Sequence, residues 1–296
     1  MIFENVPLAG KTTYGIGGAA RFYVEPSTEK GLAEAYCFAG ERGVPVFVLG
    51  NGSNLLISDR GIDGLVVNMA ARFCALIWDG ASVSALSGCT LDGLVSAAAR
   101  RGCAGIEGLS GIPGTVGGAV VMNAGAFDTE IADTLRSVRV FRNSGLTAET
   151  VDAPGLALGY RSSAIRGTGD IVVSAVFEFK DGDAARIIAS RDDILDRRRE
   201  KQPLDYPSCG SVFKRPAGNY AGTLIESCGL KGFRSGGAMV SEKHANFIIN
   251  AGNASAGDVR GVIRHVQKVV YENKGILLEP EVIFAGEFDE PLFSPG

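Results

Sequence analysis

Clustered glycine is the feature that most constrains what this chain can fold into. Glycine makes up 41 of the 296 residues, about twice its usual share of roughly 7%. Sixteen of these glycines concentrate in four stretches, at residues 15–18, 50–52, 105–125 and 229–237. Because glycine has no Cβ, such clusters indicate places where a globular backbone bends sharply or approaches a ligand closely.

Composition and charge exclude several classes of protein. Hydrophobic residues make up 46% and charged residues 21%, as in ordinary globular chains long enough for one large or several modest domains. The formal net charge is -4 and no long basic run occurs, so we expect no nucleic-acid partner. With no apolar run of membrane length and no secretory signal at the start, we expect a cytoplasmic protein without membrane insertion. We favour a monomer.

The cysteines and histidines argue against a metal site. Six cysteines are scattered without a CxxC pair, and two histidines, His244 and His265, are too few for a histidine-rich site. We therefore expect reduced cysteines and no bound metal.

Hydrophobic periodicity predicts alternating strands and helices. The first part is a β-α-β pattern: a strand at 21–25, a helix at 28–42 capped by Ser27 or Thr28 and stopped by Gly43, and an apolar strand at 44–49. Further strands are predicted at 65–67, 75–78, 81–85, 138–141, 171–179 and 277–284, and further helices at 91–101, 183–200 and 255–273. Boundaries near 68–72 and 181–203 would divide the chain into three α+β units.

Two glycine-rich stretches have the properties of a phosphate site. Residues 49–56 follow an apolar strand, and successive main-chain N–H groups there can form an anion nest to which Ser53 and Asn54 add side-chain donors. Residues 108–119 contain the Pro113-Gly114 turn and read as a second loop. A single glycine turn is usually structural, but two such loops together indicate a diphosphate held from two sides.

This diphosphate site is not of the Rossmann type. Residues 15–20 match the GxGxxA pattern formally, but they follow no apolar strand and precede a strand instead of a helix.

The same motifs resemble those of the UDP-N-acetylenolpyruvoylglucosamine reductases. To the two glycine stretches and Asn123-Ala124-Gly125, the resemblance adds segments 159–163, 208–216, 241–247 and 278–282, in the family's order across nearly the whole chain. It implies an α+β protein with a FAD-binding region of the vanillyl-alcohol-oxidase (PCMH) type in two subdomains, followed by a C-terminal substrate domain. The implied bounds are 1–70 and 71–182 for the FAD-binding subdomains and 183–296 for the substrate domain, with 277–296 returning near the active site. The short span between Arg161 and Ser211 favours the shorter, type II form.

The resemblance also implies a cofactor, a co-substrate and a reaction. FAD would be bound non-covalently, NADPH would reduce it, and the reduced flavin would reduce the enolpyruvyl double bond of UDP-N-acetylglucosamine enolpyruvate to give UDP-N-acetylmuramate for peptidoglycan. The residues that the resemblance assigns to FAD are Gly50, Asn51, Gly52, Ser53, Asn54, Leu55, Ser110, Gly111, Pro113, Gly114, Thr115, Gly117, Gly118, Asn123, Ala124, Gly125 and Ile171.

Three residues are implied to be catalytic. Arg161 would pair with the substrate carboxylate and stabilise enolate-like charge, since it stays cationic and offers a forked donor. Ser211 would donate the second proton, because a carbanion is a base strong enough for a prepositioned hydroxyl. On a strand, Glu279 and Glu281 would share a face, so the residues alone leave both open, whereas the family motif assigns the role to Glu281.

Three further charged residues are candidates for substrate binding, and one cysteine departs from the family pattern. Lys214, Arg215 and Lys243 are candidates for the UDP diphosphate, although each could be a solvated surface charge. Cys209 stands where a small residue is usual in the family. Because this thiol is close to Ser211 in the sequence, we hypothesise that the site is sensitive to oxidation.

Two rival functions stay open at this point. An oxidase with covalent FAD would need a linking residue, but no histidine precedes His244, and Cys103 is a poor alternative. A non-catalytic nucleotide-binding protein would have no need for Arg161, Ser211 and Glu281 together.

Overall fold

The computed structural model describes residues 1–289 and 291–295. The chain forms two compact units. The first unit comprises Met1–Glu4, Phe22–Asn51 and Gly64–Arg197, and the second comprises Asn5–Arg21, Gly52–Asp63 and Arg198–Gly296. In the described residues, no helix combines the length and apolar character needed to cross a membrane.

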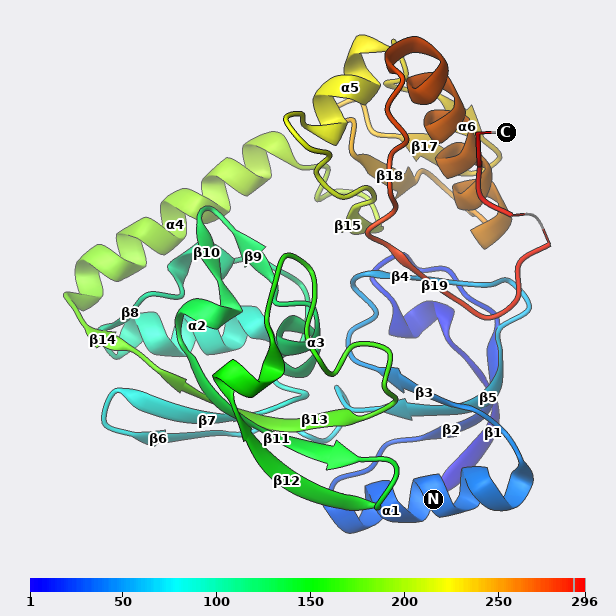
Figure 1. The fold of residues 1–296 in the computed structure, drawn as a ribbon. Coiled ribbons are helices and arrows are strands. Elements are labelled where there is room, and N and C mark those ends of the chain that lie inside the picture. Colours follow the sequence, from blue (N-terminus) through cyan, green and yellow to red (C-terminus); the bar gives the residue numbers. More distant parts are fainter. Residues whose placement is uncertain (290, 296) are drawn as a thin grey trace. The chain divides into compact units, whose positions relative to one another are not determined.

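A four-stranded sheet and helix α1 are formed by the first 68 residues (Figure 1). Its strands follow the order β1 (Ile2–Pro7), β2 (Ala19–Val24), β5 (Ile62–Asn68) and β3 (Val46–Leu49), and β3 runs parallel to β5. Helix α1 (Glu29–Arg42) begins after Thr28, whose hydroxyl accepts a hydrogen bond from the Gly31 N–H, and it ends at Gly43 with a φ of 63°. Both ends agree with the sequence prediction because both caps are local.

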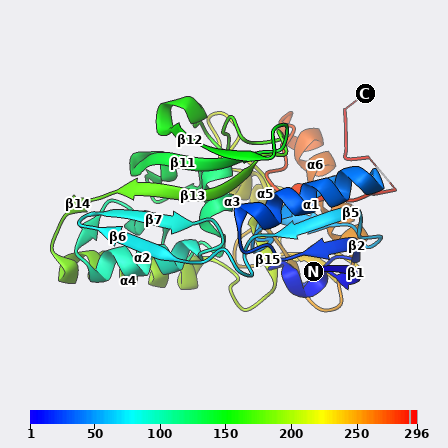
Figure 2. The same ribbon diagram turned by 90° about the horizontal axis from the view of Figure 1, so that it is seen from below.

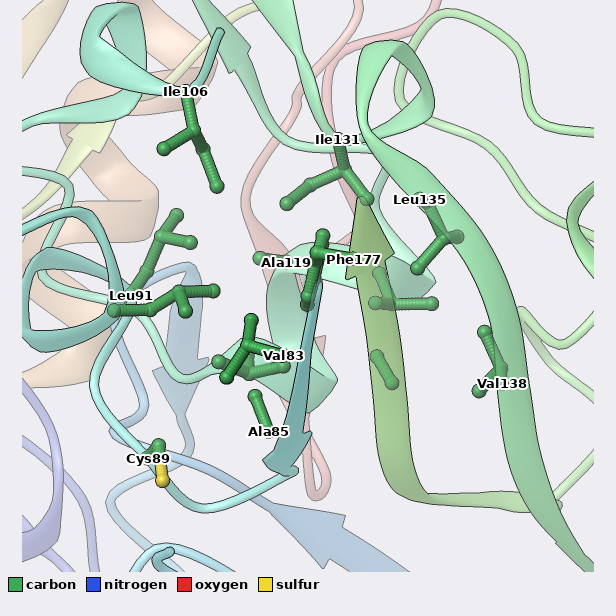
Figure 3. Packing of buried hydrophobic residues seen from close by; sticks show 14 of the residues in the cluster. Val83, Ala85, Cys89, Leu91, Ile106, Ala119, Ile131, Leu135, Val138 and Phe177 are labelled. Carbon is green, nitrogen blue, oxygen red and sulfur yellow. The ribbon is translucent and has the colours of Figure 1, made fainter. Parts of the chain in front are cut away.

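The larger sheet of the first unit is antiparallel and has five strands. In order these are β12 (Thr147–Asp152), β11 (Leu135–Arg142), β13 (Ile171–Glu178), β7 (Ser82–Leu86) and β6 (Leu76–Asp79). Helices α2 (Leu91–Arg100) and α3 (Val116–Val121) pack on one face of this sheet (Figure 2). Alternation along β7 directs Val83 and Ala85 into the core that Figure 3 shows, where α2 contributes Leu91.

Two short strand pairs and a long helix complete the first unit. They are the strand pairs β8 (Cys103–Ala104) with β14 (Lys180–Asp181) and β9 (Gly125–Ala126) with β10 (Thr129–Glu130), and most of helix α4 (Ala184–Lys201).

The second unit combines a small antiparallel sheet with two helices. Its strands follow the order β15 (Ser208–Ser211), β18 (Phe247–Asn250), β17 (Ala238–Val240) and β16 (Arg234–Ser235), and the helices are α5 (Ala221–Ser227) and α6 (Ala256–Lys274). Helix α6 starts in a capping box between Ser255 and Asp258 and ends at Gly275. Its buried stripe is Val259, Val262, Ile263, Val266 and Val270.

The prediction of a strand over 277–284 is wrong for most of that segment. The strand is confined to β19 (Ile283–Ala285), which pairs in parallel with β4 (Leu55–Ile57). Pro280 makes an isolated bridge to Phe213, and because proline has no N–H it cannot extend a ladder. Glu279 and Glu281 therefore do not share the face of a strand.

The second glycine stretch also differs from the prediction of a loop throughout. Its last part forms helix α3, capped by Thr115, whose hydroxyl accepts a hydrogen bond from the Gly118 N–H at 3.3 Å. Glycine has a low helix propensity, so the presence of Gly117 and Gly118 argues against a helix when the sequence alone is considered.

Candidate active site

The glycine loop after β3 offers unused main-chain donors. Within the part of the chain that the structure describes, the N–H groups of Gly52, Ser53 and Asn54 donate to no acceptor. Gly52 is buried and has a φ of 60°, in the left-handed region that favours glycine. Consecutive free N–H groups in such a turn form a concavity that suits an anion.

Gly50 and Asn51 lie against the second glycine stretch inside the first unit. The Asn51 side-chain amide donates to the Pro113 carbonyl at 2.9 Å. A Cβ on Gly50 would lie 2.6 Å from the Thr115 hydroxyl oxygen, so only glycine fits this close approach. The two stretches that the sequence singled out are therefore neighbours at this point.

Several amides of the second stretch are already used within the protein. The Val116 and Gly117 N–H groups donate to the carbonyls of Cys89 and Ser87, both at 2.8 Å. A ligand at this stretch would therefore meet close-packed backbone and the Thr115 side chain instead of a row of free donors. The anion-binding capacity lies mainly in residues 52–54, which form the anion loop.

Arg161 is held beside the Asn123-Ala124-Gly125 segment, also in the first unit. Its guanidinium donates to the Gly125 carbonyl at 3.0 Å and lies 5.0 Å from the centre of the Tyr160 ring. The Asn123 amide donates to the Gly159 carbonyl at 3.2 Å. Arg161 has a φ of 55°, an uncommon value for a residue other than glycine that is often found at functional sites.

Ser211 and Glu281 lie close together in the second unit. Strand β15 ends at Ser211 after an irregularity in its register, and Gly210 there has a φ of 79°. The Glu281 N–H donates to the carbonyl of Val212 at 2.7 Å. The main chain of Glu281 is therefore held beside Val212, the residue that follows Ser211. Asn54, from the anion loop, donates to the Glu281 carbonyl at 3.1 Å. Hydrogen bonds thus join Asn54 to Glu281, and Glu281 to the residue that follows Ser211.

Cys209 has the properties of an unreactive thiol. It is buried, and burial is the main reason why its pKa is raised to about 12, with the Glu281 carboxylate adding to the rise. Because the thiolate is the reactive form, this environment disfavours the oxidation hypothesis for Cys209. Beside it lies Tyr14, which the sequence did not single out; it is fully buried and its hydroxyl donates to the Ile248 carbonyl at 2.6 Å.

The cations proposed for the diphosphate have partners within the second unit. Lys214 forms an ion pair with Glu279, and the Lys243 ammonium donates to the Arg199 carbonyl. The Arg215 guanidinium lies 4.1 Å from the centre of the Tyr220 ring. A phosphate at Lys214 would therefore compete with Glu279 for the Lys214 ammonium.

Three further residues assigned to FAD are either buried among apolar side chains or hydrogen-bonded within the protein. Ile171 is buried in β13 among apolar side chains, and the Ser110 hydroxyl donates to the Glu107 carbonyl. Gly111 donates its N–H to the Asp92 carboxylate at 2.8 Å.

Comparisons with known proteins show to which class the two parts of the chain belong. The model of a FAD binding domain matches residues 20–150, and that of the UDP-N-acetylenolpyruvoylglucosamine reductase C-terminal domain matches residues 202–285. These two matches confirm the predicted fold class and define the class of the protein, a FAD-binding enzyme with a separate C-terminal domain.

Similar proteins identify the family. A UDP-N-acetylenolpyruvoylglucosamine reductase of Caldicellulosiruptor bescii is 45% identical over 294 residues, which cover 99% of this chain and 93% of that protein. One from Clostridium perfringens is 44% identical over 285 residues, covering 96% of this chain and 93% of that protein. The crystal structure of the Thermus caldophilus reductase has a TM-score of 0.84 and 36% identity, covering 97% of this chain and all of that one. The chain belongs to the UDP-N-acetylenolpyruvoylglucosamine reductase family of flavin-dependent oxidoreductases.

Proposed function

We propose that this enzyme uses NADPH and non-covalently bound FAD to reduce UDP-N-acetylglucosamine enolpyruvate to UDP-N-acetylmuramate, a step of peptidoglycan synthesis. The observation that carries the proposal is the 2.7 Å hydrogen bond from the Glu281 N–H to the carbonyl of Val212, the residue that follows Ser211. This bond brings the main chain of Glu281 beside the segment that carries Ser211, although the two lie far apart in the sequence, and the proposed reaction needs a proton donor near a charge-organising group.

The anion loop fits the diphosphate of FAD. Free N–H groups at 52–54 suit its charge, and the close approach of Gly50 to the Thr115 side chain leaves no room for a side chain at residue 50. When bound, the reduced flavin supplies the hydride. The residues 1–70 and 71–182 are the proposed FAD-binding subdomains, and 183–296 is the proposed substrate domain.

Each proposed catalytic side chain has a separate task. The Ser211 hydroxyl gives its proton to the substrate carbon that becomes carbanionic when the neighbouring carbon accepts hydride. Glu281 organises the charge around that hydroxyl. Arg161, already orientated by the Gly125 carbonyl, pairs with the substrate carboxylate and stabilises the enolate-like charge.

The UDP part of the substrate is proposed to meet Lys214, Arg215 and Lys243. Arg215 is orientated by its stacking on Tyr220. We further propose a type II enzyme that acts as a cytoplasmic monomer.

Anaerobic mixing tests the proposed reaction. The FAD-loaded enzyme should lose its yellow colour with NADPH and regain it with UDP-N-acetylglucosamine enolpyruvate, and mass spectrometry should find a product heavier by two hydrogens. Trichloroacetic acid should release the flavin into the supernatant. A flavin that stays with the pellet would favour the covalent oxidase, and NADPH-reduced enzyme that the enolpyruvyl sugar cannot reoxidise would contradict the proposed substrate.

A further inference from the structure

Two cysteines of the first unit lie in contact at the edge of its core. Cys74 is exposed in the segment between β5 and β6, and Cys89 is buried in the turn between β7 and α2 (Figure 3 shows Cys89). Their sulfur atoms are 3.0 Å apart. A disulfide bond is about 2.05 Å long, so an approach of about 1 Å would join them.

We propose that Cys74 and Cys89 form a peroxide-reactive modification site that closes reversibly to a disulfide. The inference does not depend on the proposed function, because it concerns thiols that the reaction does not use.

The main chain keeps the two sulfurs opposite each other. Phe73 and Ala75, the two neighbours of Cys74, accept hydrogen bonds from the Gly88 and Leu86 N–H groups at 2.7 and 2.9 Å. The exposed segment is therefore bonded to the turn that carries Cys89 on both sides of Cys74. This arrangement gives each thiol a high effective concentration at the other.

The Cys89 turn is the fixed side of the pair. The Cys89 carbonyl accepts from the Val116 N–H at 2.8 Å, and the Ser87 carbonyl accepts from the Gly117 N–H at the same distance. The Cys74 side chain is exposed whereas Cys89 is buried, so closure should draw the Cys74 side chain toward Cys89 and leave the glycine stretch in place.

The oxidation balances with one peroxide. The Cys74 sulfur attacks one oxygen of hydrogen peroxide, the O–O bond breaks, and water leaves while Cys74 becomes a sulfenic acid. The Cys89 sulfur then attacks the Cys74 sulfur, and the departing hydroxide takes the Cys89 proton as a second water. Two thiols lose two electrons, and a later thiol reductant restores them.

The exposure of Cys74 and the raised pKa of Cys89 favour Cys74 as the sulfur that reacts first. Burial, together with the neighbouring Cys74, raises the pKa of Cys89 to about 12, so Cys89 stays protonated until the second step. Cys74 is the accessible partner. Cys37 is also exposed, which makes it a matched control without a sulfur partner among the described residues.

Peptide mapping of the FAD-loaded enzyme after hydrogen peroxide treatment tests the site. We expect a Cys74–Cys89 cross-linked peptide in the unaltered enzyme and in Cys37→Ser, its disappearance in Cys74→Ser, and its reversal by dithiothreitol. In Cys89→Ser, Cys74 should instead proceed to sulfinic acid. Loss of the Cys74 thiol without this cross-link, or equal sulfinic acid with and without Cys89, would overturn the proposal.

Thermal unfolding provides a second readout. The disulfide closes a short loop between two segments, so oxidation should raise the Tm by roughly 5 °C, reversibly, in the unaltered enzyme and in Cys37→Ser but not in Cys74→Ser. FAD should stay bound throughout. A fall in Tm, or release of FAD as the cross-link forms, would contradict closure by movement of Cys74.

Discussion

The side-chain amide of Asn246 pairs with both polar atoms of the Phe213 main chain. Its Oδ1 accepts from the Phe213 N–H at 3.0 Å, and its Nδ2 donates to the Phe213 carbonyl at 2.9 Å. The Asn246 main-chain carbonyl accepts from the Val212 N–H at 2.8 Å. Asn246 therefore holds the main chain of Val212 and Phe213, the two residues after Ser211. Val212 is also the residue to which the Glu281 N–H donates.

Removing this amide should destabilise the fold and slow the substrate half-reaction. Asn246→Ala leaves two buried main-chain groups of Phe213 without partners, which should cost about 1–3 kcal/mol of unfolding free energy. Urea unfolding measures this loss, and Asn273→Ala on the exposed side of α6 is the control. Flavin reoxidation by substrate should slow while reduction by NADPH does not. Equal slowing of both steps would argue against a positioning role.

Asn246→Asp should make the substrate half-reaction depend on pH. A protonated carboxyl offers one donor and one acceptor, as the amide does, whereas a carboxylate would face the Phe213 carbonyl. Burial should raise the pKa of the new carboxyl, so reoxidation should be faster at low pH and slow as pH rises through that value. Parallel pH profiles for Asn246→Asp and the unaltered enzyme would contradict this.

Gly50→Ala should weaken FAD binding without a large change elsewhere. The added methyl group would lie 2.6 Å from the Thr115 hydroxyl and displace the cap of α3. We expect at least a tenfold rise in the Kd for FAD, measured by fluorescence titration. Gly40→Ala in α1 is the matched control, since a Cβ there meets nothing within 4 Å and should stabilise the helix. Unchanged FAD affinity in Gly50→Ala would mean that this contact does not support the cofactor loop.

His244 should make stability fall on the acid side. Burial, and secondarily the positive charge of Lys231, lower the pKa of His244 below its ordinary value of 6.5. Between the lowered pKa and 6.5, the unfolded chain binds a proton that the folded chain does not. Unfolding free energy should therefore fall as pH drops through 6.5, by no more than about 1.4 kcal/mol per pH unit for this group. His244→Gln should flatten that part of the curve, and an unaltered slope would exclude His244 as its origin.

The sequence predicts the ends of those helices whose caps and hydrophobic periodicity are local. Thr28 and Gly43 delimit α1, and Ser255 with Gly275 delimits α6, because each signal lies within a few residues of the helix end that it specifies. The segment with Pro280 was misread because its apolar residues imitate a strand, while its hydrogen bonds depend on Phe213 and Val212 far away in the chain.

The same distinction applies to the candidate site. The motifs single out Ser211 and Glu281 as candidates, but the Asn246 amide and the contact of Cys74 with Cys89 depend on tertiary packing, which spacing does not reveal. Cys209 shows the converse, since its proximity to Ser211 suggested reactivity and its burial removes it.

Anaerobic stopped-flow absorbance of Ser211→Ala tests the central claim most directly. NADPH should bleach the bound flavin at the normal rate, while the enolpyruvyl substrate should restore its colour far more slowly than in the unaltered enzyme, because only the second half-reaction needs the Ser211 proton. Failure of bleaching with FAD still bound, or recolouring at the normal rate, would contradict the role assigned to Ser211.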